Sequence, residues 1–184
     1  MLLQLRGSSG SGKSYVAHQL LERYEHKPLY NPAVRKTVPY AYALPGGLFI
    51  LGGYTARGGG VDGWPVETTV RELEALDEPG RFIFFEGLLI SRSRGQWERL
   101  ARNGHEYVAA ILDTPPELCI QRVYERNGGK QINEWRLRDN HRGARTAVRY
   151  MGEAGIDTVT IRHGRSVEDV LSVLRDHGWT GDRS

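Results

Sequence analysis

A glycine-rich loop near the start of the chain is the sequence feature that most constrains the fold. Gly7, Gly12, Lys13 and Ser14 fit the spacing G-x-x-x-x-G-K-[ST] within the stretch GSSGSGKS. An apolar run precedes this loop and a helix-patterned run follows it. The order strand, loop, helix suits phosphate binding, because backbone N–H groups turn inward and the helix directs the positive end of its dipole at the anion.

The residues of this loop have distinct expected roles. Lys13 is expected to reach the β and γ phosphates of a nucleotide, and the Ser14 hydroxyl is expected to ligate Mg²⁺. A Gly/Ser-rich linker can match the spacing by accident, but it would lack the flanking strand and helix. The loop is therefore predicted to bind ATP through Gly7, Ser8, Ser9, Gly10, Ser11, Gly12, Lys13 and Ser14.

Strands and helices are predicted to alternate along the whole chain. After the first strand, apolar runs at 48–53, 81–90, 107–115 and 157–162 indicate four more strands, each followed by a helix-patterned run. This alternation predicts an α/β fold with a parallel five-stranded sheet and helices on both faces, which makes three layers. We expect a single domain, 1–184, with ligands bound at the carboxyl ends of the strands.

Composition excludes several classes of protein. Among 184 residues, 39% are hydrophobic and 26% charged, which is ordinary for a globular chain. No segment has the pattern of a signal peptide, and no apolar run approaches the roughly 18 residues of a membrane span. The single cysteine, Cys119, cannot form an intramolecular disulfide. A soluble, cytoplasmic protein without a membrane partner is expected.

Positive charge is concentrated in one segment. Residues 122–149 contain eight cations and three anions, a net charge of +5, while the whole chain is only +3. The rest of the chain is therefore net negative, and the basic segment needs a local explanation. Phosphate binding is one such explanation, because guanidinium groups bind phosphate oxygens in a bidentate way.

Two acids are candidates for the chemistry. Glu86 ends a buried strand, where an ionised carboxylate is costly unless a cation such as Mg²⁺ lies nearby. Asp62 follows another strand in a glycine-rich loop, where a carboxylate can accept the proton of a substrate hydroxyl as the phosphoryl group arrives. An ordinary turn residue is the alternative for Asp62, and which of the two is the base stays open.

Aromatic residues in the same loop suggest a binding site for a flat ring. Tyr54 and Trp64 flank Arg57, so the two rings could stack on a base while the guanidinium holds an anionic group. The alternative is that the aromatics belong to the core beneath the loop. We predict that Tyr54, Arg57, Asp62 and Trp64 contribute to the acceptor site.

Four stretches resemble the small P-loop kinases of nucleosides, nucleotides and similar metabolites: GSSGSGKS, FFEG, LDTPPELCIQRVYER and the arginine-bearing segment. The resemblance covers nearly the whole chain and implies an ATP- and Mg²⁺-dependent phosphotransferase. FFEG resembles the strand end of uridine-kinase-like enzymes, where the glutamate faces the metal. The loop LGGYTARGGGVDGW is similar to that of phage-encoded P-loop kinases, including those that phosphorylate 5-hydroxymethyluracil bases in DNA.

The same resemblance implies that residues 122–149 form a lid over the phosphates. Arg122 and Arg126 lie four apart on one helix face, and Arg138 and Arg142 repeat this spacing on the next helix. In kinases with such lids, arginines at these positions hold phosphates, neutralise the transition state or stack on adenine. Arg122 and Arg126 are therefore predicted to be catalytic, with Arg122 also binding nucleotide, and Arg138 and Arg142 to bind substrate. A solvated basic face is the alternative.

Three functions remain open from the sequence. The favoured one is a kinase of 5-hydroxymethyluracil in phage DNA, working in the host cytoplasm, because basic residues dominate affinity for nucleic acid. The second is a kinase of a free nucleoside, nucleotide or small alcohol, including an antibiotic phosphotransferase. The third is a regulatory ATP-binding module. The chain has no N-K-x-D sequence, so recognition of guanine is not expected.

Overall fold

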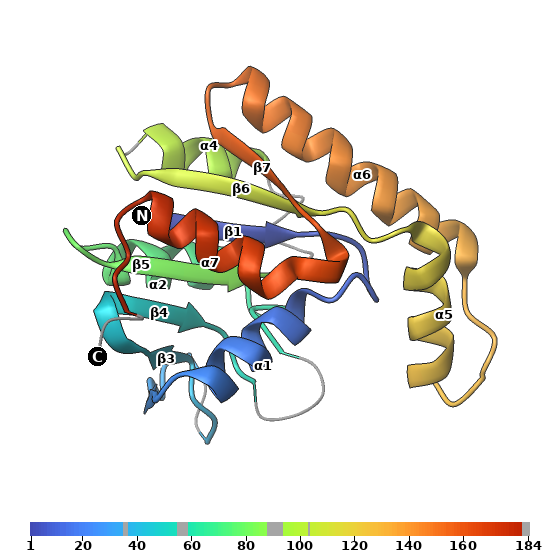
Figure 1. Cartoon of the computed structure of the whole chain (residues 1–184), viewed down its shortest axis with the longest axis horizontal. Helices are drawn as coiled ribbons and strands as arrows, with labels where there is room; N and C mark the ends of the chain where they lie inside the picture. Colours follow the sequence, from blue (N-terminus) through green and yellow to red (C-terminus); the bar gives the residue numbers. More distant parts are fainter. Residues whose placement is uncertain (35–36, 55–58, 88–93, 103, 182–184) are drawn as a thin grey trace.

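One twisted sheet of seven strands forms the centre of the molecule, with helices packed on both of its faces (Figure 1). The structure is a computed structural model, and it describes residues 1–34, 37–54, 59–87, 94–102 and 104–181. The order of strands across the sheet is β2-β3-β4-β5-β1-β6-β7. The strands are β1 (Leu2–Arg6), β2 (Lys27–Leu29), β3 (Ala41–Ala43), β4 (Leu48–Leu51), β5 (Phe82–Glu86), β6 (Tyr107–Leu112) and β7 (Asp157–Ile161).

The helices fill the connections between the strands, much as the sequence pattern indicates. They are α1 (Lys13–Arg23), α2 (Val66–Leu76), α4 (Arg94–Arg102), α5 (Pro116–Arg126), α6 (Glu134–Glu153) and α7 (Ser166–Asp176), with short 3₁₀ turns η1 (Pro45–Gly47) and η2 (His163–Arg165). Within the described residues, none of these helices is long and apolar enough to span a membrane.

The predicted α/β architecture is confirmed, but the purely parallel five-stranded sheet is wrong. Strands β4, β5, β1, β6 and β7 do run parallel to one another. Two additional strands, β2 and β3, pair antiparallel at the β4 edge, which makes the sheet mixed. They were missed because each has only three residues and both come from a proline-rich stretch that lacks a clear period of two.

Two apolar layers hold the helices against the sheet. On one face, Leu3, Leu5 and Phe84 pack with buried residues of α1 and α7. On the other face, Ile83 and Phe85 pack with buried residues of α2, α4 and α6. Alternate residues of β1 and β5 thus face opposite layers, as the period of a strand requires. The carboxyl ends of the parallel strands are left open at one edge, where the loops collect.

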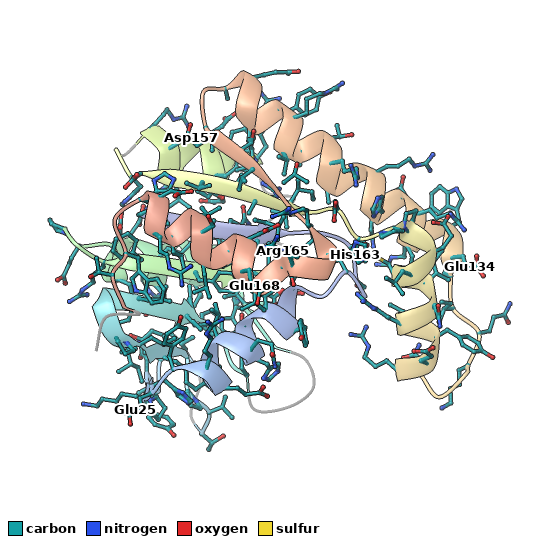
Figure 2. All side chains as sticks on the ribbon, viewed as in Figure 1. Glu25, Glu134, Asp157, His163, Arg165 and Glu168 are labelled. Carbon is teal, nitrogen blue, oxygen red and sulfur yellow. The ribbon has the colours of Figure 1, made fainter. Side chains whose placement is uncertain are left out.

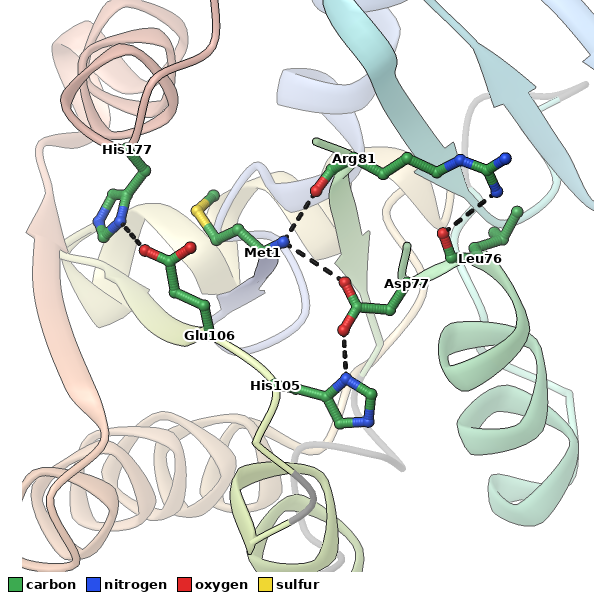
Figure 3. A network of polar contacts seen from close by, with 7 residues as sticks. All are labelled: Met1, Leu76, Asp77, Arg81, His105, Glu106 and His177. Carbon is green, nitrogen blue, oxygen red and sulfur yellow. Dashed lines mark hydrogen bonds and ion pairs between the residues drawn. The ribbon is translucent and has the colours of Figure 1, made fainter. Parts of the chain in front are cut away.

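Polar contacts close the opposite end of the sheet, where the parallel strands begin (Figure 3). The Met1 amino group donates to Arg81 O at 2.8 Å and lies 3.4 Å from Asp77 Oδ1. His105 contacts the same aspartate, and His177 Nδ1 lies 2.6 Å from Glu106 Oε1. These contacts join the segments that enter β1, β5 and β6. The carboxyl ends of the strands therefore remain as the side available for ligands.

An ion pair between Arg162 and Asp169 holds the corner between β7 and α7. Arg162 donates from its backbone N at 2.9 Å, from Nε at 2.8 Å and from a terminal nitrogen at 2.5 Å to the Asp169 carboxylate. The side-chain hydrogen bond from Arg162 is the main reason why the pKa of Asp169 lies below its ordinary value. The corner positions η2, which borders the site described below.

Asp169→Asn is expected to lower the free energy of unfolding by about 1 kcal/mol at pH 7, because a charge-assisted surface contact is weakened. Since the pKa of Asp169 is depressed in the folded protein, this stabilisation is present above pH 3.8 and is lost as the pH falls through the depressed pKa. Urea unfolding of both proteins at pH 7 and near pH 3 measures the difference. A difference that is equal at the two pH values would contradict this assignment.

Candidate active site

The glycine-rich loop connects β1 to α1 at the carboxyl edge of the sheet. Gly12 has φ of +106°, a backbone conformation that favours glycine, and α1 begins directly after it at Lys13. The first N–H groups of a helix have no partner within the helix, so they are available to an anion. The Lys13 ammonium is buried and donates to Gly7 O and Ser8 O, both at 3.1 Å. The loop therefore holds its curved shape through Lys13.

Neighbouring elements fix the outer side of this loop. Gly10 has φ of +81°, and a Cβ there would lie 2.3 Å from Cys119 O, so only glycine fits against α5. Thr114, which follows the end of β6, donates from its Oγ1 to Ser11 O at 2.7 Å. Arg122 donates to Gly10 O at 3.3 Å. Packing against α5 thus brings Arg122 onto the loop.

Glu86 lies at the end of β5, directly beside the start of α1. Its side chain is 1% exposed, and Ser14 Oγ donates to its Oε1 at 2.8 Å. Burial raises the pKa of Glu86, while Lys13 and the Ser14 hydrogen bond oppose that rise. A buried carboxylate next to a hydroxyl is an oxygen-rich point that a cation would stabilise. Ser14 and Glu86, both predicted as metal ligands, thus lie next to each other.

Close backbone contacts around Gly60 bring the segment that carries Asp62 next to Glu86. Gly53 N donates to Gly60 O at 3.2 Å, and Val61 N donates to Glu86 O at 3.1 Å. Gly60 has φ of +86°, and a Cβ there would lie 2.4 Å from Glu86 Oε1. The chain can therefore pass beside Glu86 only because residue 60 has no side chain. Asp62 follows two residues later with an exposed side chain.

These segments surround one cavity of about 380 Å³. It combines the phosphate loop, two acids and two arginines, drawn from four parts of the chain. Its lining is Ser9, Gly10, Gly12, Lys13, Ser14, Tyr15, Gly59, Asp62, Glu86, Arg122 and Arg126. The five residues that the sequence suggested for the chemistry all line this cavity: Lys13, Asp62, Glu86, Arg122 and Arg126. Gly7, Ser8 and Ser11 were also predicted to bind ATP but do not line this cavity, and the side chains of Ser8 and Ser11 are buried.

A second cavity adjoins the first on the α7 side of the loop. It has a volume of about 260 Å³ and shares Gly12, Tyr15 and Arg122 with the phosphate-loop cavity. Ser11 of the loop, with His163 and Ser166 from η2 and the start of α7, completes its wall. The sequence reasoning missed His163 and Ser166. They follow the last strand, and the rule that ligands bind at the carboxyl ends of parallel strands was the signal that could have found them.

The predicted site in which Tyr54 and Trp64 stack on a flat ring is not formed. Tyr54 is 6% exposed and packs against Tyr42 and His18, and Trp64 is 5% exposed and packs in the layer under α2. Both are core aromatics, so neither presents a face to a substrate. Burial raises the pKa of Tyr54 well above its ordinary value, with Glu86 and Asp62 contributing. Arg57 lies outside the described residues.

Arg138 and Arg142 are not brought to the phosphate-loop cavity. Arg138 donates to Glu117 at 2.8 Å, and Arg142 lies 3.9 Å from Asp139 on the exterior of α6. Arg142 also borders a separate, mostly apolar cavity of about 440 Å³ between α4 and α6. Of the arginines in the predicted lid, Arg122 and Arg126 on α5 therefore line the phosphate-loop cavity. Helical spacing correctly placed these arginines on shared faces but did not show where each face points.

Comparisons with known proteins fit this geometry. The family model for 5-hmdU DNA kinase matches residues 1–162. A 5-hmdU DNA kinase of Pseudomonas phage M6 is 33% identical over 189 residues, which cover 96% of this chain and 98% of the relative. A 5-hmdU DNA kinase of Pseudomonas phage PaMx11 is 36% identical over 136 residues, covering 70% of each chain. 5-hmdU DNA kinase 1 of Salmonella phage ViI is 34% identical over 141 residues, which cover 72% of this chain and 62% of the relative.

Among solved structures, one from the PezAT chromosomal toxin-antitoxin system of Streptococcus pneumoniae has a similar fold. Its TM-score is 0.51 at 17% sequence identity, over 90% of this chain and 69% of that chain. At this level of identity, the similarity concerns the arrangement of strands and helices alone.

Proposed function

Because the chain belongs to the 5-hmdU DNA kinase family, we propose that it transfers the γ-phosphoryl group of ATP to the hydroxymethyl oxygen of 5-hydroxymethyluracil bases in DNA. In this reaction the acceptor oxygen forms a bond to the γ phosphorus, the bond from that phosphorus to the β–γ bridging oxygen breaks, and ADP leaves. The acceptor hydroxyl proton must be removed. The observation that carries the proposal is the cavity that joins the phosphate loop to Glu86, Asp62, Arg122 and Arg126.

ATP is proposed to bind with its β and γ phosphates in the loop. The N–H groups at the start of α1 and the Lys13 ammonium supply fixed positive charge there. Arg122 and Arg126 border the same cavity from α5, so their guanidinium groups can neutralise charge that develops on the transferring oxygens. The adjoining cavity at Tyr15, His163 and Ser166 offers room for the nucleoside part of ATP.

Ser14 and Glu86 fit a magnesium site. The hydroxyl and the carboxylate are 2.8 Å apart, and oxygen ligands are those that Mg²⁺ prefers. In the part of the chain that the structure describes, no cluster of three or more His, Cys, Asp or Glu residues forms a protein cage. Mg²⁺ in kinases is usually held by one or two protein oxygens together with phosphates and water, so this sparse set is suitable. When bound, the metal would neutralise negative charge on the phosphates of ATP.

Asp62 is proposed to act as the base for the acceptor hydroxyl. It is exposed, whereas Glu86 is buried and engaged by Ser14, so Asp62 is the carboxylate that an incoming hydroxyl can reach. The lid is proposed to consist of the end of α5, with Arg122 and Arg126, closing over the phosphates. Since the relatives named above are phage proteins, the host cytoplasm is the proposed place of action.

The proposed function is tested with γ-labelled ATP and three acceptors. These are duplex DNA containing 5-hydroxymethyluracil, the same duplex containing thymine, and free 5-hydroxymethyl-2′-deoxyuridine. Label is expected in the first DNA alone, and digestion to nucleosides should locate it on the hydroxymethyl group. Labelling of the free nucleoside without labelling of DNA would instead indicate a small-molecule kinase. ATP binding without transfer to any acceptor would favour a regulatory module.

A further inference from the structure

The outer face of α6 carries a row of arginines that the phosphate-loop cavity does not use. Arg138, Arg142, Arg145 and Arg149 are spaced at i, i+4, i+7 and i+11, so they follow one stripe along the helix; they are called the α6 stripe below. The helix buries its other side, where Ala144 and Val148 pack against Ile111 of β6. Figure 2 shows Glu134 at the right margin of the molecule and side chains that project outward along α6.

All four arginines of the α6 stripe are exposed, and Arg142 and Arg149 are weakly paired, whereas Arg138 donates to Glu117 at 2.8 Å. The side chains of Arg142 and Arg149 are 69% and 65% exposed, and their nearest acids, Asp139 and Glu153, lie at 3.9 Å and 3.6 Å. Exposed pairs of this kind contribute little to stability, so Arg142 and Arg149 can each exchange the acid for a phosphate at little cost. The helix as a whole contains five arginines and three acids. A positive field therefore remains along it.

We propose that the α6 stripe docks the phosphate backbone of the DNA duplex that contains the acceptor base. This proposal rests on the proposed function and adds where the polymer binds. The stripe covers 12 residues, 138–149, and rises about 16.5 Å along the helix at 1.5 Å per residue. Duplex DNA carries about one charge per 1.7 Å of its axis, so a stripe of that length lies opposite several phosphates. A free nucleoside would have no use for such a surface.

An exposed tryptophan extends the same surface toward the N-terminal end of α6. Trp135 is 70% exposed, although an indole ring normally gains from burial. It lies on the outward side of the helix, one turn before Arg138. Exposed aromatic rings beside arginines stack on unstacked bases, and enzymes that act on a base within a duplex must first expose it. Trp135 is therefore the residue of this surface that contacts a base rather than a phosphate.

The test compares variants by their salt dependence of DNA binding. Binding of a labelled duplex with one 5-hydroxymethyluracil is measured between about 50 and 200 mM salt. The double variant Arg142→Gln with Arg149→Gln should reduce the slope of log K against log salt by about 2, roughly one per arginine, and raise the KM for DNA about tenfold. Trp135→Ala should weaken binding about 5- to 100-fold without changing the slope, because it removes stacking and no charge.

A matched control removes two charges elsewhere. Lys27, on the far edge strand β2, and Arg71, on α2, are both exposed, and changing both to glutamine should leave the salt slope at the wild-type value. If wild-type protein phosphorylates DNA but the α6 double variant keeps the wild-type slope, the docking surface is wrong while the proposed function stands. If wild-type protein phosphorylates only the free nucleoside, both fail. Loss of a dimer in the double variant, measured by light scattering, with an unchanged slope would make this face a contact between copies and would also overturn the proposal.

Discussion

Lys13→Ala is expected to lower the rate of phosphoryl transfer by roughly 10³-fold or more, because it removes a positive charge placed on the transferring oxygens. Lys13 Nζ is held between Gly7 O and Ser8 O, so the ammonium is already fixed inside the cavity before ATP arrives. Fixed charge of this kind needs no rearrangement at the moment of reaction. Single-turnover transfer from γ-labelled ATP to DNA containing 5-hydroxymethyluracil measures the loss.

The control for this variant is Lys27→Ala, which removes an exposed lysine from β2 and should keep the full rate. Because Lys13 also holds two carbonyls of the loop, thermal unfolding of Lys13→Ala must be compared with that of the wild-type protein. A folded Lys13→Ala protein with near-normal turnover would remove the kinase assignment. A variant that unfolds early would be replaced by Lys13→Met, which keeps the packing of the aliphatic side chain and removes its charge and its N–H donors.

Asp62→Asn is expected to lower the rate of transfer by roughly 10² to 10⁴, the usual contribution of a positioned base, while ATP affinity stays nearly unchanged. The exposed position of Asp62 on the rim of the cavity, apart from the phosphate loop itself, is the reason for this separation. Glu86→Gln should behave differently. It should raise the Mg²⁺ concentration needed for half-maximal rate, and added Mg²⁺ should restore part of the activity.

The measurement is ATP affinity beside single-turnover transfer, for both variants at several Mg²⁺ concentrations. Glu67→Gln, on the exposed part of α2, supplies a control for the loss of one carboxylate. Normal transfer by Asp62→Asn together with an inactive Glu86→Gln at every Mg²⁺ concentration would reverse the two roles. Glu86 would then be the better candidate for the base.

The parallel part of the fold followed from local patterns, whereas the edge of the sheet did not. Five apolar runs joined by helix-patterned runs are enough to predict parallel strands, since each crossover must be helical. Strands β2 and β3 have three residues each, and Lys27–Leu29 contains a proline. β3 forms by pairing with β4, and β2 forms by pairing with β3, and no periodicity within the segment indicates this pairing.

The site was predictable where chemistry is local and was not where it depends on packing. Lys13 and Ser14 belong to one motif, and Glu86 is identified by the cost of a carboxylate at the end of an apolar strand. Burial of Tyr54 and Trp64 depends instead on which layer each side chain joins after the loop folds back. Gly60 shows the same limit, because its need for a missing Cβ arises only from contact with Glu86.

The two adjoining cavities that meet at Gly12 and Arg122 bear on the order in which substrates bind. One opens beside Asp62 and Gly59, and the other opens beside His163 and Ser166, on the α7 side of the loop. A nucleotide entering by the second opening would leave the first accessible to the acceptor. Neither substrate would have to depart before the other arrives, so the geometry suits direct transfer within a ternary complex. Initial-rate plots for such a mechanism intersect, whereas a phosphorylated enzyme intermediate would give parallel lines.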